Sequence, residues 1–197
     1  SLLTPDAGLT GHTNARLQAL PTAQIVRRQD FTEDLFKIWL EPSVPFNFKP
    51  GQYITIGCQD LERPYSIASS PDEELIELFV EYVEPQHGGK LTPLLYAQHV
   101  GDTVSMRPRP KGIFCMDDAY TDHLLVGTVT GIVPYVSYIR QYLRDGRTGH
   151  RFFVMEGASH QDEFVYDQEF MELAKQHEFI EFVATVSRPQ AERNEGW

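Results

Sequence analysis

The chain has few of the residues that hold metals or clusters. It has only two cysteines, Cys58 and Cys115, and its seven histidines are scattered without an HxxxH or HxH pair. Two thiols are too few for an iron–sulfur cluster or a structural zinc site, each of which takes about four ligands. The sequence therefore predicts no metal centre. It favours two free, buried thiols in a reducing compartment over a disulfide.

The chain also has no long apolar run and no excess of positive charge. No stretch of about 18 apolar residues occurs, which argues against a membrane-spanning helix, and the N-terminus lacks the pattern of a signal peptide. Lysine and arginine number 17 against 28 acidic residues, for a net charge of −11. A general nucleic-acid binder needs a basic face, so that class is disfavoured. These absences predict a cytoplasmic globular protein.

The first part of the chain carries the pattern of antiparallel strands. In LFKIWLEP the alternation places Phe36, Ile38 and Leu40 on one face of a half-buried strand. Strand-like runs follow in KPGQYITIG, LIELFVEYV and GDTVSMRP, with one short helix over residues 92–98. Short strands separated by turn residues predict an antiparallel Greek-key β-barrel.

After about residue 120 the apolar residues form continuous runs. DHLLVGT, RFFVMEG and FIEFVATVS are typical of buried parallel strands, and two amphipathic stretches lie between them. Pro134 stands where a first helical turn accepts proline, and Gly146 stands where a helix ends. Strand–helix–strand–helix–strand at this spacing predicts a parallel sheet with right-handed crossovers.

The predicted fold class is therefore β + α/β, in three parts. Residues 1–20 form a loose arm, residues 21–118 the β-barrel domain, and residues 119–197 the parallel α/β domain.

Two stretches in the first half are candidates for ligand binding. In LERPYSIASSP, Arg63 and Tyr65 share a face of a strand and suit a ligand with both a phosphate and a flat aromatic ring. In HGGKLTPLL, two glycines precede a helix whose N-cap would be Thr92, which favours an anion. Taken singly, the first stretch fits a surface strand, and the second a glycine turn with a capped helix, better than a ligand site.

Two more candidates lie at strand ends in the second half. GTVTGIVP joins a strand to a helix where parallel sheets bind phosphorylated ligands, although it is neither GxGxxG nor a Walker loop. TVSR ends the third parallel strand at the same edge, where Ser187 and Arg188 suit a phosphate monoester. An arginine beyond a strand is as often simply solvated. The order and spacing of the four stretches are more specific than any one of them.

In this order the stretches resemble motifs of the ferredoxin–NADP reductase family, the two-domain flavin reductases, over roughly residues 22–197. RPYSIAS is similar to the family's R-x-Y-[ST] flavin motif, GGKLTPLL to its segment under the FAD pyrophosphate, GTVTGIVP to its GTGTGIAP loop, and VSR to its adenosine 2′-phosphate motif. KPGQY and VGDTV also occur where the family has them. The resemblance is greatest to the bacterial branch, and it implies FAD and NADP(H) as cofactors.

The resemblance also implies roles for single residues toward FAD. Arg63 pairs with the pyrophosphate, Tyr65 stacks on the isoalloxazine, Ser66 lies near flavin N5, and Thr130 bridges flavin and nicotinamide. Tyr65, Ser66 and Thr130 are therefore the expected catalytic residues. The full expected FAD set is Arg63, Pro64, Tyr65, Ser66, Glu81, Tyr82, Val83, Gly89, Lys90, Leu91, Thr92 and Thr130.

Toward NADP(H), the resemblance implies a pyrophosphate loop and a 2′-phosphate site. Ser187 and Arg188 take the 2′-phosphate, which favours NADPH over NADH. The loop consists of Gly127, Thr128, Gly131 and Pro134.

Three departures from the family pattern concern this second half. Val129 replaces the loop's second glycine and adds bulk where a pyrophosphate approaches. GAS at residues 157–159 replaces a GVR that carries an arginine near NADP. The chain ends at RNEGW, about 50 residues before a complete reductase of this type would end, so the α/β domain is expected to be truncated.

The leading hypothesis is an FAD-dependent oxidoreductase that takes hydride from NADPH and passes single electrons to ferredoxin or flavodoxin. Both carriers are usually acidic, so RPRPK at residues 107–111 is the candidate docking patch, or else a solvated strand end. One alternative is a flavin-containing subunit of a larger oxygenase or dehydrogenase complex. Another is a flavin-binding relative without NADPH turnover, which Val129 and Ser159 favour.

Overall fold

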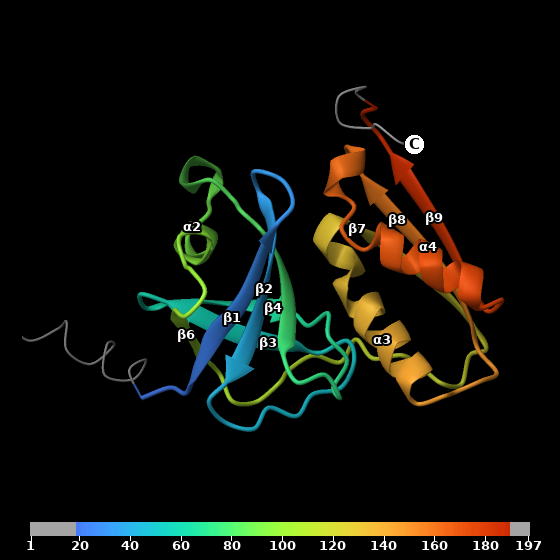
Figure 1. Cartoon of the computed structure of the whole chain (residues 1–197), viewed down its shortest axis with the longest axis horizontal. Helices are drawn as coiled ribbons and strands as arrows, with labels where there is room; N and C mark the ends of the chain where they lie inside the picture. Colours follow the sequence, from blue (N-terminus) through green and yellow to red (C-terminus); the bar gives the residue numbers. More distant parts are fainter. Residues whose placement is uncertain (1–18, 190–197) are drawn as a thin grey trace, which may run out of the picture.

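The computed structural model describes residues 19–189, which form two sheets side by side with a helix between them (Figure 1). The first sheet is antiparallel with strand order β4-β3-β6-β1-β2-β5, and the second is parallel with order β7-β8-β9. The predicted fold class, an antiparallel β-barrel followed by a parallel α/β unit, is confirmed. The predicted arm over residues 1–20 lies outside the described residues except for its last two, and so does the end of the chain from residue 190.

The elements follow one another in two blocks. The barrel strands are β1 (Thr22–Asp30), β2 (Leu35–Pro42), β3 (Tyr53–Cys58), β4 (Leu61–Ser66), β5 (Ile76–Glu81) and β6 (Thr103–Met106), with η1 (Pro85–His87) and α2 (Leu91–Tyr96) between β5 and β6. The second block is β7 (Asp122–Thr128), η2 (Val129–Ile132), α3 (Val133–Arg144), β8 (Arg151–Ala158), η3 (Gln161–Glu163), α4 (Asp167–Gln176) and β9 (Ile180–Val186).

The barrel closes around an apolar core. Phe36, Ile38 and Leu40 point into this core, as the alternation in LFKIWLEP predicts. The segment after β4 completes the closure, because the Ala68 N–H donates to the Glu77 carbonyl of β5 at 2.9 Å.

Strand β1 is not predicted by the sequence pattern. Its pairing with β2 shifts register between Ile25 and Arg27, and this bulge breaks the alternation of apolar and polar residues. The charged run that follows the bulge hides the remaining signal, although Ala23 and Ile25 are fully buried.

The half-buried assignment of β2 is wrong, because both of its faces are covered. Lys37 and Leu35 point away from the barrel core, yet they are only 8% and 1% exposed. Leu35 and Phe79 of β5 belong to a second apolar core with residues of α3 and α4. The α/β half therefore packs against the outer face of the barrel at β2 and β5.

The two thiols also differ from the prediction. Both are free, but Cys115 is exposed and Cys58 is half-buried. Burial raises the pKa of the Cys58 thiol to about 11. No helix among residues 19–189 is long and apolar enough to cross a membrane.

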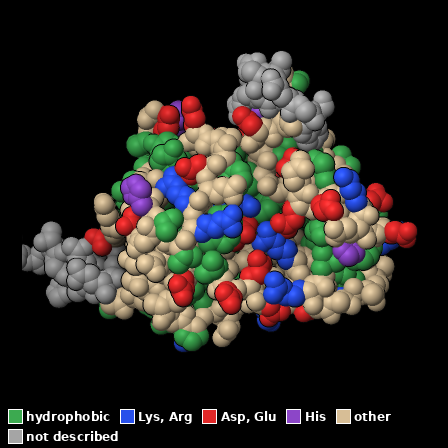
Figure 2. Space-filling model, in the orientation of Figure 1, with side chains coloured by type: hydrophobic (Ala, Val, Ile, Leu, Met, Phe, Trp, Pro, Cys, Tyr) green, Lys and Arg blue, Asp and Glu red, His purple; other side chains and the backbone are tan. Residues whose placement is uncertain are grey.

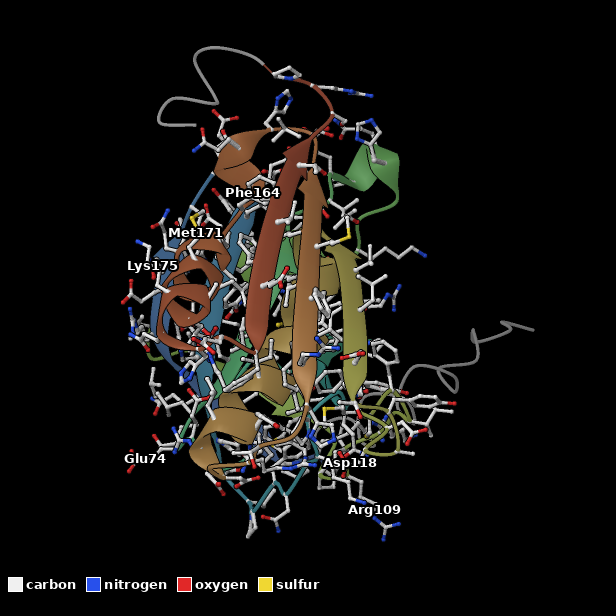
Figure 3. The ribbon with its side chains drawn as sticks, turned by 90° about the vertical axis from the view of Figure 1, so that its right-hand side faces the viewer. Glu74, Arg109, Asp118, Phe164, Met171 and Lys175 are labelled. Atoms are coloured by element: carbon white, nitrogen blue, oxygen red, sulfur yellow. The ribbon has the colours of Figure 1, made fainter. Side chains whose placement is uncertain are left out.

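Helices cover one face of the parallel sheet. Leu125, Phe152 and Val154 pack toward α3 and α4, while the opposite face has no helix over it in the described chain (Figure 3). That open face carries the exposed side chains Leu124, Val126, Met155 and Val183.

Candidate functional site

Strand β4 presents an arginine and a tyrosine on one face. Arg63 is exposed, and the partner of its guanidinium in the structure is a carbonyl, that of Glu62, at 2.7 Å. No carboxylate among residues 19–189 forms an ion pair with it, whereas Arg107 binds the Glu62 carboxylate through two bonds of 2.7 Å. Arg63 is thus a cation that is available to an external anion.

Tyr65 lies beside this cation and against the barrel. It pairs with Ile54 of β3 and packs partly on the barrel core. Burial raises the pKa of the phenol to about 12, although nearby Arg63 acts in the opposite direction. Tyr65 therefore stays a neutral aromatic surface at physiological pH. Ser66 ends the strand opposite Tyr53 and is half-buried, and Pro64 is exposed.

The structure brings the two expected FAD segments after β5 together. The Val83 N–H donates to the Thr92 hydroxyl at 2.9 Å, and that hydroxyl lies 3.3 Å from the Val83 carbonyl. A Cβ on Gly89 would lie 1.7 Å from the same carbonyl, so glycine is required there.

One expectation for this segment is corrected. Thr92 is not the N-cap of α2, because the helix begins at Leu91 and its N-cap is Lys90, which makes no side-chain cap bond. The Thr92 hydroxyl instead fastens the helix to Val83. Leu91 is 1% exposed, and its side chain packs in the barrel core. Lys90 is exposed.

Glu81 and Tyr82 line a cleft of about 910 Å³ that residues of both halves form. Its walls are the β1–β2 turn over residues 31–34, residues 81–84, His87 and Asp162 of η3. Carboxylates dominate the lining, and burial, together with Asp34 and Glu163, raises the pKa of Glu81. Such a cleft suits hydroxyls and ring nitrogens better than a phosphate group.

The loop after β7 has the tight turn that a phosphate site needs. A Cβ on Gly127 would lie 2.8 Å from the Gly131 carbonyl group, whereas a Cβ on Gly131 would meet nothing within 4 Å. Thr128 and Gly131 are exposed, Thr130 is half-buried, and Pro134 is buried as part of α3. The open side of the loop therefore faces solvent at Thr128 and Gly131.

Val129 departs from the expectation that its bulk stands toward the ligand. Its side chain packs against the second apolar core. Its backbone has φ = +44°, a region that β-branched residues rarely adopt. The replacement of glycine thus produces backbone strain within the loop.

The tips of the three parallel strands meet at one edge. Thr128 pairs with Gly157, the Ser187 N–H donates to the Ala158 carbonyl at 3.0 Å, and the Arg188 N–H donates to the Ser159 carbonyl at 2.9 Å. Ser187 and Arg188 are exposed. The expected NADP residues from β7, the following loop and β9 therefore lie along the carboxyl edge of the sheet.

Two buried glutamates are absent from the set of residues predicted from the sequence. Glu77 is 3% exposed and binds Lys37, Arg140 and Tyr166. Glu156 of β8 is 1% exposed, and neither carboxylate oxygen has a hydrogen-bond partner among residues 19–189. The signal in both cases is a glutamate inside an apolar strand, IELFV and FFVMEG, where a charge needs a reason to be buried.

Comparison with known proteins agrees with this architecture. A family model described as "Oxidoreductase NAD-binding domain" matches residues 125–196. A ferredoxin NADP+ reductase from Neisseria gonorrhoeae, solved with bound FAD and NADP, superposes with a TM-score of 0.76 at 19% identity, over 88% of this chain and 70% of that one. The chain therefore has the two-part fold of that structure, and its second part matches the model of a nucleotide-binding domain.

Curated relatives narrow the class to a family. Ferredoxin–NADP reductase B of Sorangium cellulosum (strain So ce56) is 31% identical over 181 residues, covering 88% of this chain and 69% of the relative. The ferredoxin–NAD(P)(+) reductase component of the naphthalene 1,2-dioxygenase system of Pseudomonas putida is 32% identical over 157 residues, 78% of this chain. The chain belongs to the ferredoxin–NADP reductase family. It spans about half the length, 46%, of the Pseudomonas relative.

Proposed function

We propose that the protein is a cytoplasmic FAD-dependent oxidoreductase that takes a hydride from NADPH and passes electrons one at a time to ferredoxin or flavodoxin. The observation that carries this proposal is the pair on β4, an exposed arginine without a carboxylate partner next to a neutral, half-buried tyrosine. A diphosphate joined to a flat ring is the ligand that such a pair fits.

The residues present fit FAD. Arg63 would hold the pyrophosphate and Tyr65 would carry the ring system. Gly89, which has no room for a side chain beside the Val83 carbonyl, would keep its segment close to Val83. The carboxylate-lined cleft at residues 81–84 would receive the hydroxyl-bearing and adenine parts, which carry no negative charge. When bound, the flavin supplies the chemistry, since it accepts two electrons together and releases them singly.

The carboxyl edge of the parallel sheet fits NADP(H). The loop with Gly127, Thr128 and Gly131 offers backbone N–H groups to a pyrophosphate. Ser187 and Arg188 at the tip of β9 would bind the 2′-phosphate and so select NADPH over NADH. The half-buried Thr130 would lie between the two ligands.

The docking patch for an acidic carrier is narrower than the five residues of RPRPK. Arg107 is committed to Glu62, which leaves Arg109 and Lys111 as the exposed cations. Together with Thr55, Pro108 and Arg107 they line a recess of about 380 Å³. A shallow basic recess suits transient docking of an acidic protein.

A second candidate function has one observation in its favour. The Pseudomonas relative is named as the reductase component of a dioxygenase system. In that case this chain would pass electrons inside a complex, and partner proteins would co-purify with it.

The test is an anaerobic titration of the purified, FAD-loaded protein with NADPH, followed by absorbance. We expect the flavin band to bleach with NADPH and far less with NADH. Arg63→Ala should lose most of the bound FAD, because the diphosphate loses its cation. Arg151→Ala is the matched control, since Arg151 forms an exposed pair with Asp122 away from β4. A protein that stays yellow after Arg63→Ala would contradict the assignment.

A further inference from the structure

The strand that carries the flavin residues continues directly into a buried segment. After Ser66 the chain runs through residues 67–70, which are at most 1% exposed. The Ser69 hydroxyl accepts a hydrogen bond from the Glu77 N–H at 3.0 Å. This segment is therefore fixed to β5 within three residues of the expected flavin N5 contact.

The same serine also binds the helix that follows the nucleotide loop. The Ser137 hydroxyl of α3 donates to the Ser69 carbonyl at 2.8 Å, and Ser137 is fully buried. Ser137 lies only seven residues beyond Thr130, and α3 lies between the two sheets (Figure 1). One buried hydrogen bond thus connects the backbone of the flavin strand to the nucleotide helix.

An ionic cluster lies next to this bond. Arg140 of α3 donates to Glu77 of β5 at 3.1 Å and to Glu169 of α4 through two bonds of 2.9 and 2.7 Å. Glu77 also accepts from the Tyr166 hydroxyl at 2.5 Å, and Lys37 of β2 lies 3.3 Å from it. On the surface that Figure 2 draws, basic and acidic side chains also lie close together near the middle of the molecule. The cluster joins two barrel strands to both helices of the α/β half.

The ionisation of the cluster is set by its partners. Burial alone would raise the pKa of Glu77, but Arg140, Lys37 and the Tyr166 hydroxyl hold that pKa below its ordinary value. Burial lowers the pKa of Lys37, and Glu77 offsets part of this effect. Glu77 is thus an ionised carboxylate inside the interface.

Such a cluster fixes the relative position of the two halves more than it stabilises the fold. A buried ion pair rarely stabilises a fold more than apolar residues of equal volume would. Apolar surfaces, however, slide over one another, whereas forked guanidinium bonds and buried hydroxyl bonds hold only in one arrangement. Apolar packing alone would hold the two halves together without buried polar groups. This interface nevertheless contains five of them, those of Lys37, Ser69, Glu77, Ser137 and Tyr166.

We propose that Ser69, Glu77, Ser137 and Arg140 form an interdomain clamp of positioning residues that fixes the flavin strand relative to the nucleotide loop. The inference rests on the proposed function, because the spacing that the clamp fixes is the one between Ser66 and Thr130. The clamp touches neither ligand. It acts on the rate at which bound NADPH reduces bound flavin, and not on the affinity for either.

The test compares three variants of the full chain loaded with FAD. Ser137→Ala removes one buried hydroxyl, Arg140→Met removes the charge but keeps most of the aliphatic length, and Arg151→Met removes an exposed guanidinium as the control. The dissociation constants for FAD and NADP+ are measured first, and the rate of anaerobic bleaching by NADPH second. Arg140 is the shared cation of Glu73, Glu77 and Glu169. Arg140→Lys, which keeps the charge, is therefore the rescue variant, and it also replaces Arg140→Met if that protein does not fold.

We expect Ser137→Ala and Arg140→Met to slow bleaching roughly tenfold, since small displacements of reacting groups have effects of this order. Both dissociation constants should stay close to wild type, Arg140→Lys should recover part of the rate, and the control should match wild type. Unchanged bleaching in both clamp variants, or a loss that appears in the dissociation constants, would overturn the proposal.

Hydrogen exchange separates this proposal from the proposed function. If wild-type protein binds FAD but NADPH does not bleach it, the proposed function is rejected and the clamp is judged on exchange alone. Ser137→Ala should then accelerate exchange in residues 67–70 and in α3, and leave β3 and β6 unchanged. Exchange that is identical to wild type in those two segments would reject the clamp as well.

Discussion

Glu156 shows what a single buried residue can do to the pH dependence of this protein. Burial raises the pKa of its carboxyl to about 8, and Asp167 at the start of α4 adds to this effect. The folded protein therefore holds a proton that the unfolded chain releases above the ordinary pKa of 4.5. Its contribution to stability is most favourable below about pH 4.5, declines as the pH rises towards 8, and is constant above that.

Glu156→Gln should remove this dependence, because an amide does not titrate. Each unit of raised pKa costs about 1.4 kcal/mol once both states are ionised. We therefore expect the Tm of the variant, relative to wild type, to rise by several degrees between pH 5 and pH 8. Thermal unfolding of both proteins over pH 4–9 measures this difference in Tm. A difference in Tm that does not vary with pH would show that folding does not raise the pKa of Glu156.

At the residue scale, the sequence predicted the candidate ligand-binding residues that can be identified by residue type and by order along the chain. Arg63, Tyr65 and Ser66 stand in a recognisable motif, and the structure places the first two on one face of β4. The sequence did not predict the partners of Glu77, because these come from β2, α3 and the N-cap of α4, which are far apart in the chain.

The loop between β7 and α3 is the element in which backbone conformation and sequence conflict. Val129 has a positive φ there while its side chain packs on the second core. A left-handed conformation costs a residue with a Cβ about 1–2 kcal/mol, and glycine is exempt from this cost.

Two substitutions at this position separate strain from packing. Val129→Ala and Val129→Gly both remove the packed side chain, but only glycine also relieves the backbone. We expect Val129→Gly to be more stable than Val129→Ala by about 1 kcal/mol, the reverse of the usual order. Urea unfolding of the two variants decides the matter. A more stable alanine variant would show that the loop relaxes out of the left-handed region.

The sequence predicted where helices and strands occur better than it predicted which of their faces are buried. Strands β2 to β9 follow from alternation, apolar runs and turn residues, whereas β1 is obscured by its bulge. The burial of both faces of β2 was not predictable, because local alternation does not reveal which outer face another part of the chain will cover. The same reason applies to Thr92, whose hydroxyl binds Val83 instead of capping its own helix.

At the scale of the whole molecule, charge distribution bears on the partner. The net charge of −11 would repel an acidic carrier at long range, so the cations at Arg109 and Lys111 have to act locally. Figure 3 shows Arg109 at the opposite side of the molecule from Lys175 of α4. Two exposed cations in different settings therefore allow a matched comparison.

Reversing the charge of Arg109 and Lys111 together should weaken the reaction with ferredoxin. We expect the KM for ferredoxin to rise about fivefold or more at low ionic strength and the effect to shrink in high salt. Reduction of a small neutral dye by NADPH should be unchanged. Lys175→Glu serves as the control. An equal rise in KM for Lys175→Glu would mean that the carrier responds to total charge and not to this recess.

The sharing of β2 and β5 between two apolar cores limits how freely this architecture can be recombined. Leu35 and Phe79 are side chains of the barrel strands, yet they are interior residues of the other half. In a chimera joined at residue 118 to the nucleotide-binding part of a relative, the outer face of β2 and β5 would not be complementary to the helices that pack on it. A chimera with either half exchanged would fold only if the outward-facing residues of β2 and β5 were exchanged to match.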